Sequence, residues 1–221
     1  MTSLLRFSGL TAMTLAAVLS MTAGLAMAGD NVSADQIVKA LQPKPVTRGL
    51  SLAAPADPAA KARELSFVDS LRNRTTRSLS LGERAEIADL TPTKPRIDLE
   101  IQFDYNSARI AKTSTQAVEE LGKALSNPAL RGSTFVVAGH TDGIGGYAFN
   151  QDLSERRADT IKRYLMQNYG IAASDLVTVG YGKTRLKDAQ DPTDPVNRRV
   201  EIVNLQTQST SNKVAPCCAS Q

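Results

Sequence analysis

The sequence predicts an α+β fold, a two-layer sandwich with the element order β-α-β-α-β-β over residues 96–205. Two kinds of pattern predict it. Apolar residues alternate or run together over stretches of strand length, and between the first three of these stretches they recur at helical spacing. One sheet covered on one face by two helices is the arrangement that buries both patterns.

The first strand, the first helix and the second strand precede a sharp turn. Ile97–Phe103 alternates apolar residues with polar or charged ones, which is typical of a half-buried strand. Residues 111–126 place apolar side chains on one helical face, and Asn127-Pro128 ends that helix. Residues 133–138 (STFVVA) form the second strand.

The second helix and two more strands complete the sheet. Asn150–Tyr169 carries an apolar stripe, and Gly170 stands where a helix commonly ends with a left-handed residue. Residues 175–182 and 198–205 are apolar runs of strand length. The polar loop between them, residues 183–196, contains two prolines.

The N-terminus has the features of a secretory signal peptide. Arg6 precedes a short apolar run, Leu10–Leu25, and Ala26-Met27-Ala28 matches the small-residue cleavage pattern. We therefore predict a signal peptide over residues 1–28 and an exported protein. An uncleaved membrane anchor is the alternative interpretation, although the run is short for a span.

The segments that flank the predicted domain look irregular. Residues 29–95 contain a stretch rich in proline and alanine with short amphipathic pieces around it, so we predict a flexible linker with short helical pieces. One hypothesis is that this region docks on another envelope protein or on a second copy of this chain. Residues 206–221 are predicted to be a disordered tail, in which Cys217 and Cys218 are either incidental thiols or pair between chains.

Charge and composition argue against a nucleic acid, a metal or a cofactor as a partner. The formal net charge is +4, but residues 96–205 carry equal numbers of basic and acidic residues. A nucleic-acid binder needs a concentrated basic face, so we expect no nucleic-acid partner. The chain has one histidine, so it cannot supply the several histidine ligands of a typical histidine-based metal site. We expect neither a metal nor a cofactor.

A glycine-rich turn follows the second strand. Gly143–Ala148 matches G-x-G-x-x-A between a strand and a helix, the context of a dinucleotide site. Asp142 would face a pyrophosphate with like charge, however, and Lys162 and Arg163 stand where a ribose-binding acid is expected. A sharp chain reversal explains the glycines equally well.

The same turn contains the residue types of a hydrolase triad. His140, Asp142 and Ser154 are the three. Ser154 falls on the predicted helix without a strained elbow around it. A hydrolase is therefore the weaker hypothesis for this turn, and a histidine that orients the turn by hydrogen bonding explains His140 better. We expect a protein that is not an enzyme.

A clamp for a zwitterion is the third interpretation of the turn. Asp142 follows a strand end, and Arg157 lies about two turns into the next helix. A carboxylate accepts hydrogen bonds from an ammonium, and a guanidinium donates two parallel bonds to a carboxylate. The α-centre of an amino acid presents both groups. From spacing alone, a helix cap and a surface ion pair explain the two residues as well.

Several ordered motifs resemble one known family. They are GHTD at 139–142, LSERRA at 153–158, VGYG at 179–182, NRRVEI at 197–202 and IQFDYNSARI at 101–110. Together they resemble the OmpA-like C-terminal domain. The resemblance implies non-covalent binding of Gram-negative peptidoglycan through the diaminopimelate of its stem peptide. It also implies a protein of the periplasm, associated with the cell wall, that links the wall to the outer membrane.

The resemblance also implies roles for individual residues. Asp142 would receive the ammonium and Arg157 the carboxylate of the free α-centre of diaminopimelate. The expected supporting residues are Thr141, Asn150, Asp104, Asn106, Arg198 and Arg199. The chain departs from the family pattern before Asn197, where two prolines replace a Gly-Arg-Ala-type segment. Contacts from this loop are therefore not predicted.

Overall fold

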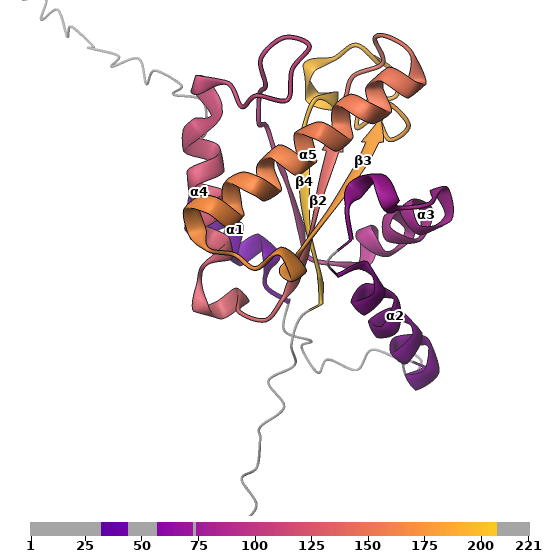
Figure 1. Ribbon diagram of the computed structural model, residues 1–221, viewed down its shortest axis with the longest axis vertical. Helices are drawn as coiled ribbons and strands as arrows, with labels where there is room; N and C mark the ends of the chain where they lie inside the picture. Colours follow the sequence, from indigo (N-terminus) through magenta and orange to yellow (C-terminus); the bar gives the residue numbers. More distant parts are fainter. Residues whose placement is uncertain (1–31, 44–56, 73, 207–221) are drawn as a thin grey trace, which may run out of the picture. The chain divides into compact units, whose positions relative to one another are not determined.

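The structure is a computed structural model, and it describes residues 32–43, 57–72 and 74–206 (Figure 1). The predicted signal peptide, residues 1–28, and the C-terminal cysteine pair lie outside the described residues. The predictions for these two segments therefore stay predictions.

A mixed sheet forms the centre of the described part of the chain. Its strands stand in the order β1-β4-β2-β3; β2 and β3 run parallel, and β4 runs antiparallel to both β1 and β2. In the middle of the sheet Val137 lies opposite Ile202 on one side and Thr178 on the other. The strands are β1 (Arg96–Leu99), β2 (Thr134–His140), β3 (Leu176–Gly182) and β4 (Val200–Gln206).

Three helices pack on one face of the sheet: α1 (Ala34–Leu41), α4 (Thr115–Leu125) and α5 (Tyr147–Tyr169). The predicted α+β fold and its element order β-α-β-α-β-β are confirmed. α5 starts three residues before the predicted Asn150, directly after Gly146, and Gly170 ends it with φ 63° as predicted. The core under these helices combines residues from the sheet and all three helices, among them Ile37, Leu41, Val118, Leu121, Phe135, Val137, Ile161, Leu165 and Ile202.

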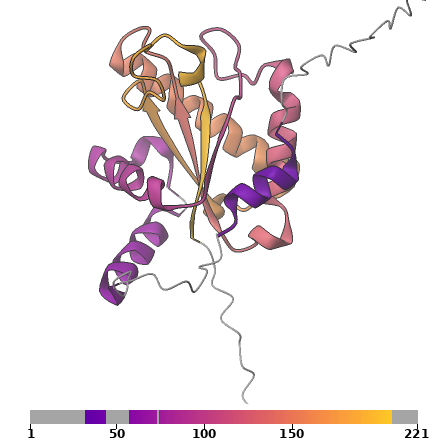
Figure 2. The same cartoon turned by 180° about the vertical axis from the view of Figure 1, so that it is seen from behind.

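The opposite face of the sheet is also covered. α2 (Pro58–Leu71) and α3 (Leu81–Leu90) lie across the sheet from α1 and α4, as the two opposed views show (Figure 1, Figure 2). The sheet is therefore the middle of three layers, one more than the predicted two. The side chains of this second core are Val68, Leu71, Leu79, Ile87, Ala88, Val136, Ala138, Val177, Val179, Tyr181, Val203 and Leu205.

This second core changes the interpretation of residues 29–95. The sequence predicts a flexible linker with short helical pieces there, and the described parts of the region contain α1, α2 and α3. All three contribute side chains to the two cores, so they pack on the domain instead of forming a free spacer. A buried ion pair between Arg84 of α3 and Glu155 of α5, 2.8 Å long, ties the added layer to the domain.

The first strand is shorter than the alternation over 97–103 suggested. β1 ends at Leu99, where the amide of Ile101 donates to the Leu99 carbonyl and bends the chain out of the sheet. Phe103 then pairs with Ile110 in an isolated antiparallel bridge. The apolar residues of this stretch stay partly or fully buried, but Phe103 now belongs to a loop above the sheet.

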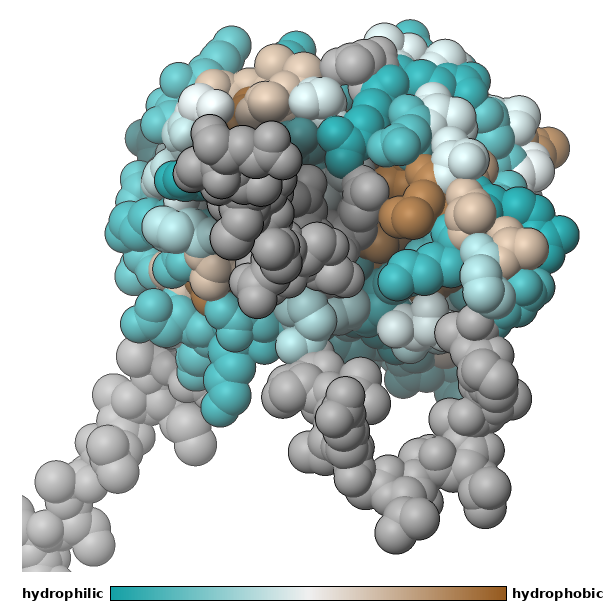
Figure 3. Space-filling model, turned by 90° about the horizontal axis from the view of Figure 1, so that it is seen from below, coloured by the Kyte–Doolittle hydropathy of each residue, from teal (hydrophilic) through white to brown (hydrophobic). Residues whose placement is uncertain are grey.

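The face of the described part that is seen from below is predominantly polar (Figure 3). Seen from below, hydrophilic residues dominate the coloured part of the face, and hydrophobic residues gather only in small areas (Figure 3). Among the described helices, none combines the length and the apolar character that a membrane span requires.

Candidate functional site

The sheet topology gathers the candidate residues at one edge. β1, β2 and β3 end at the same edge at which the antiparallel β4 begins. The chain after β1 carries Asp104 and Asn106, the chain after β2 carries Thr141 and Asp142, and Arg198 stands just before β4. Residues nearly 100 positions apart in the sequence therefore meet in the loops at the top of Figure 1.

A cleft of about 620 Å³ lies among these loops. Six of the eight predicted site residues line it, and Asp104 and Arg199 do not. A smaller hollow of about 230 Å³ adjoins the cleft and shares Phe103, Arg157 and Arg198 with it. The six lining residues are Thr141, Asp142, Asn150, Arg157, Arg198 and Asn106.

Asp142 supplies the negative charge of the cleft. Its side chain is 14% exposed, and one carboxylate oxygen lies 2.9 Å from a guanidinium nitrogen of Arg198. The other oxygen accepts a hydrogen bond from the amide of Ile144 at 3.2 Å. Because a carboxylate offers about four acceptor positions, these contacts hold Asp142 in place and still leave room for a further donor.

Arg157 enters the cleft from α5. Its Nε donates to the carbonyl of Ser107 at 3.0 Å, and its guanidinium lies over the ring of Phe103, 4.9 Å from the centroid. Burial lowers the pKa of Arg157, while the nearby Asp142 carboxylate acts in the opposite direction. Among the described residues Arg157 has no ion-pair partner, so its two terminal nitrogens keep their donors for a ligand.

Thr141 and Asn150 line the cleft, and their side-chain hydrogen bonds hold the turn. Both residues are buried. The Thr141 hydroxyl donates to the carbonyl of Asp142 at 3.0 Å, and the side-chain amide of Asn150 donates to the carbonyl of Ile144 at 2.7 Å. Both bonds fix the backbone that carries the Asp142 carboxylate.

Asp104 and Asn106 belong to the turn on the other side of the cleft. Asp104 forms an ion pair with Arg109, and its carbonyl accepts from the amide of Ser107 at 3.0 Å. Asn106 has φ 50°, a left-handed conformation that asparagine tolerates better than most residues. The structure thus uses Asp104 to shape the turn, and Arg157 fixes the same turn through Ser107.

The two neighbouring arginines point to different places. Arg198 lines the cleft and pairs with Asp142, whereas Arg199 lies 3.4 Å from a carboxylate oxygen of Asp98 and lines the adjoining hollow. Alternation along an extended chain explains the difference, because consecutive side chains point to opposite sides. The prediction had treated Arg198 and Arg199 as equivalent.

The proline-containing loop supports the glycine turn. The amide of Gly143 donates to the carbonyl of Pro192 at 2.6 Å, and Lys183 donates to the carbonyl of Gly145, also at 2.6 Å. Asn197 is fully buried, and its side chain bonds five backbone groups of the loop that precedes it. The loop 183–196, for which no ligand contact is predicted from the sequence, therefore stabilises the turn that carries Asp142.

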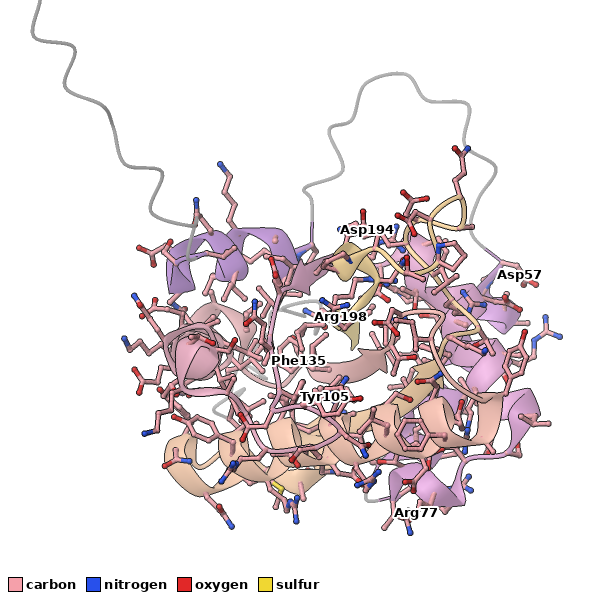
Figure 4. All side chains as sticks on the ribbon, turned by 90° about the horizontal axis from the view of Figure 1, so that it is seen from above. Asp57, Arg77, Tyr105, Phe135, Asp194 and Arg198 are labelled. Atoms are coloured by element: carbon pink, nitrogen blue, oxygen red, sulfur yellow. The ribbon has the colours of Figure 1, made fainter. Side chains whose placement is uncertain are left out.

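Apolar residues of the cleft were missed by the sequence analysis. Tyr105 is 100% exposed, and Ile144 and Phe149 are also largely exposed beside the charged groups. Figure 4 shows Tyr105 and Arg198 together above the sheet, on the same side of α5. The signal was present in the sequence, because large apolar residues in turns that cannot enter a core suggest a binding surface.

Ser154 and His140, two residues of the hydrolase hypothesis, are buried and bonded within the fold. Ser154 is fully buried, donates to the carbonyl of Gln151 and accepts from the amide of Gly182. His140 is buried on the other face of the sheet, 3.4 Å from Glu201. In the glycine turn, the amides of Gly143 and Ile144 already donate to Pro192 and Asp142 and are not free for a phosphate.

Comparison with known proteins identifies the family of the part of the chain that carries the cleft. Residues 102–199 match the family model described as OmpA family. The chain therefore carries a domain of the OmpA family. All eight predicted site residues fall within the matched range, whereas α1, α2 and α3 precede it.

Relatives of the OmpA-family domain include outer membrane proteins. Outer membrane porin F of Pseudomonas fluorescens is 39% identical over 117 residues, which are 51% of this chain and 35% of that protein. Outer membrane protein A of Klebsiella pneumoniae is 36% identical over 85 residues, 38% of this chain and 24% of that protein. The chain thus spans about a third or less of these curated relatives.

Among solved structures, the OmpA-like domain of FopA1 from Francisella tularensis subsp. tularensis SCHU S4 is similar to this chain. The two share 27% sequence identity. The similarity covers 49% of this chain and 70% of that one, with a TM-score of 0.41.

Proposed function

We propose that the OmpA-family domain binds peptidoglycan non-covalently, by holding the free α-centre of diaminopimelate in the stem peptide. The observation that carries the proposal is the cleft in which the carboxylate of Asp142 and the guanidinium of Arg157 are both available. The family resemblance of the motifs around these residues supports the same ligand.

The chemistry of the two groups fits the two ends of a zwitterion. The Asp142 carboxylate accepts from the ligand's ammonium, and the terminal nitrogens of Arg157 donate to its carboxylate. Arg198 neutralises Asp142 in the unliganded cleft and is the second guanidinium within reach of a carboxylate. Hydrogen bonds to charged groups contribute about 1.5–3 kcal/mol each, which gives reversible binding without a chemical step.

Reversible binding of a wall component suits a protein that anchors or spaces layers of the cell envelope. Relatives named as outer membrane proteins support a location in the envelope. The periplasm is the compartment in which the diaminopimelate of Gram-negative peptidoglycan is accessible, so the proposed function includes a periplasmic location.

Co-sedimentation with purified sacculi tests the proposal. We expect Asp142→Ala and Arg157→Ala each to weaken binding at least about tenfold, because each removes a charge-assisted partner of the ligand. Arg131→Ala is the matched control, since Arg131 is exposed and lines none of the hollows described above. Wild-type sedimentation by both cleft variants would rule the clamp out.

Two kinds of sacculi identify the recognised group. Walls with diaminopimelate present a free ammonium and a free carboxylate on one carbon, whereas walls with lysine in the same position end in an ammonium alone. We expect strong binding to the first and weak binding to the second. Equal binding to both would show that the Arg157 contact with a carboxylate is not used.

A further inference from the structure

A second hollow lies on the opposite side of α5 from the cleft. It has a volume of about 510 Å³ and is lined by α5 and by the segment around the short helix η1 (Thr76–Ser78). Figure 4 shows Arg77 on the outer side of α5, away from Tyr105 and Arg198. We call this hollow the basic groove.

Five basic side chains line the basic groove, and they come from two segments about 80 residues apart. They share the groove with small or apolar residues such as Ala108 and Met166. The spacing along α5 places Arg156, Arg163 and Met166 on one helical face. The five are Arg74, Arg77, Arg156, Lys162 and Arg163.

Acidic partners neutralise only part of this charge. Arg77 and Arg156 share the carboxylate of Asp152, each at 2.8 Å, and Arg74 pairs with Glu83. Arg163 forms no ion pair within the described residues and donates only to the hydroxyl of Thr160. Two basic side chains, those of Lys162 and Arg163, thus line the groove without an acid in ion-pair distance.

Lys162 is held at the inner end of the groove. Its ammonium donates to the carbonyl of Leu176 at 2.6 Å. Burial lowers the pKa of Lys162, while the Asp159 carboxylate, which lies beyond ion-pair distance, acts in the opposite direction. The acid that lines the groove, Asp159, accepts instead from the hydroxyls of Thr76 and Thr178. A half-buried ammonium without a paired acid is costly unless an anion accompanies it.

The wall of the groove is fixed before any ligand binds. Thr76 is buried, and its hydroxyl contacts both Asp159 of α5 and Thr178 of β3. These contacts hold the segment with Arg74 and Arg77 against the helix. The charges therefore converge on the groove without a loop having to order first, which reduces the entropic cost of binding.

We propose that the basic groove binds a phosphate group carried by an organic molecule. Guanidinium groups match the planar array of phosphate oxygens, and the ammonium of Lys162 adds a point charge. The small apolar residues beside the charges suit the carbon part of such a ligand. This inference does not depend on peptidoglycan binding, because the groove and the cleft have no lining residue in common.

Titration of the purified protein with inorganic phosphate, followed by amide chemical shifts, tests the proposal. We expect saturable shifts confined to residues 74–78 and 156–166. The double variant Lys162→Gln/Arg163→Gln should weaken the saturation at least tenfold, and Arg131→Gln, an arginine outside the groove, should leave it unchanged. Unsaturable shifts, or equal affinity in the double variant, would overturn the proposal.

Vesicle flotation then distinguishes the source of the phosphate. Binding to phosphatidylglycerol vesicles that the double variant loses identifies a lipid headgroup, and phosphate binding without vesicle binding identifies a soluble phosphate ester. Sacculus sedimentation of the same protein samples reports on the cleft separately. Failure of the groove and failure of the cleft are therefore distinguishable.

Discussion

Gly139 shows how a single residue positions the proposed wall-binding site. It lies near the end of β2, and a Cβ atom at this position would stand 2.4 Å from the backbone carbonyl oxygen of Ser154 in α5. Only glycine therefore lets the helix that carries Arg157 approach this strand. The same reasoning explains Gly180 in β3, where a Cβ would meet the backbone amide of Glu155 at 2.7 Å.

We expect Gly139→Ala to lower the free energy of unfolding by about 1–3 kcal/mol, the usual cost of overpacking a core. Backbone atoms, unlike a flexible side-chain tip, cannot yield without moving the helix. Urea denaturation measures the change, with Gly82→Ala as the control. Gly82 lies in α3, where a Cβ would meet only the Ser80 hydroxyl at an ordinary contact distance of 3.9 Å, so alanine there should be neutral or stabilising. Equal stability of the two variants would contradict the packing argument.

At the scale of elements, the sequence predicted the matched domain well because its patterns are local. The apolar stripe of α5 and the alternation of apolar and polar residues in β1 indicate which face of each element is buried. Gly170 ends α5 as expected. The placement of Asp142 and Arg157 in one cleft could be anticipated from the motifs, but the ion-pair partner of Asp142 could not. The ion pair between Asp142 and Arg198 joins residues 56 positions apart, and spacing along the chain carries no information on such a contact.

The third layer could not be predicted from its own helices. α2 buries only Val68 and Leu71, and α3 only Ile87 and Ala88, so neither has a pronounced apolar stripe. The sequence feature that indicates a third layer lies in the strands. Every residue of β2 and of β3 is buried, and such runs are typical of strands covered on both faces. Such a face needs a covering layer, and among the described residues α2 and α3, which lie in the segment assigned to the linker, provide it.

We therefore expect Ile87→Ala to destabilise the whole domain. Ile87 is fully buried in the second core, and truncating such a side chain costs about 2–5 kcal/mol. Leu81→Ala in the same helix is the matched control, because Leu81 is 84% exposed and should change stability by less than about 0.5 kcal/mol. Thermal unfolding followed by circular dichroism measures both. If residues 58–90 were a loose spacer, the two variants would behave alike.

At the scale of the whole molecule, the two faces of the sheet have different chemistry. The face covered by α1, α4 and α5 lies next to the cleft. The face covered by α2 and α3 contains a buried polar cluster around His140. The ring of His140 lies 5.4 Å from the ring of Tyr181 and 3.4 Å from Glu201, and its Nδ1 is 3.2 Å from the carbonyl of Arg185. The charged groups that act on it are Glu201, Asp98 and Arg199. The cluster joins β2, β3 and β4, so its protonation concerns the stability of the entire sheet.

Burial lowers the pKa of His140 more than the neighbouring carboxylates raise it. The unfolded chain therefore takes up this proton at a higher pH than the folded chain does. Stability should be unaffected above the ordinary histidine pKa of about 6.5 and should fall as the pH decreases from there toward the lower folded value. The slope for one proton is at most about 1.4 kcal/mol per pH unit. Urea denaturation at several pH values measures it, and His140→Gln should remove this component. An identical pH dependence in the variant would show that His140 binds its proton equally well in both states.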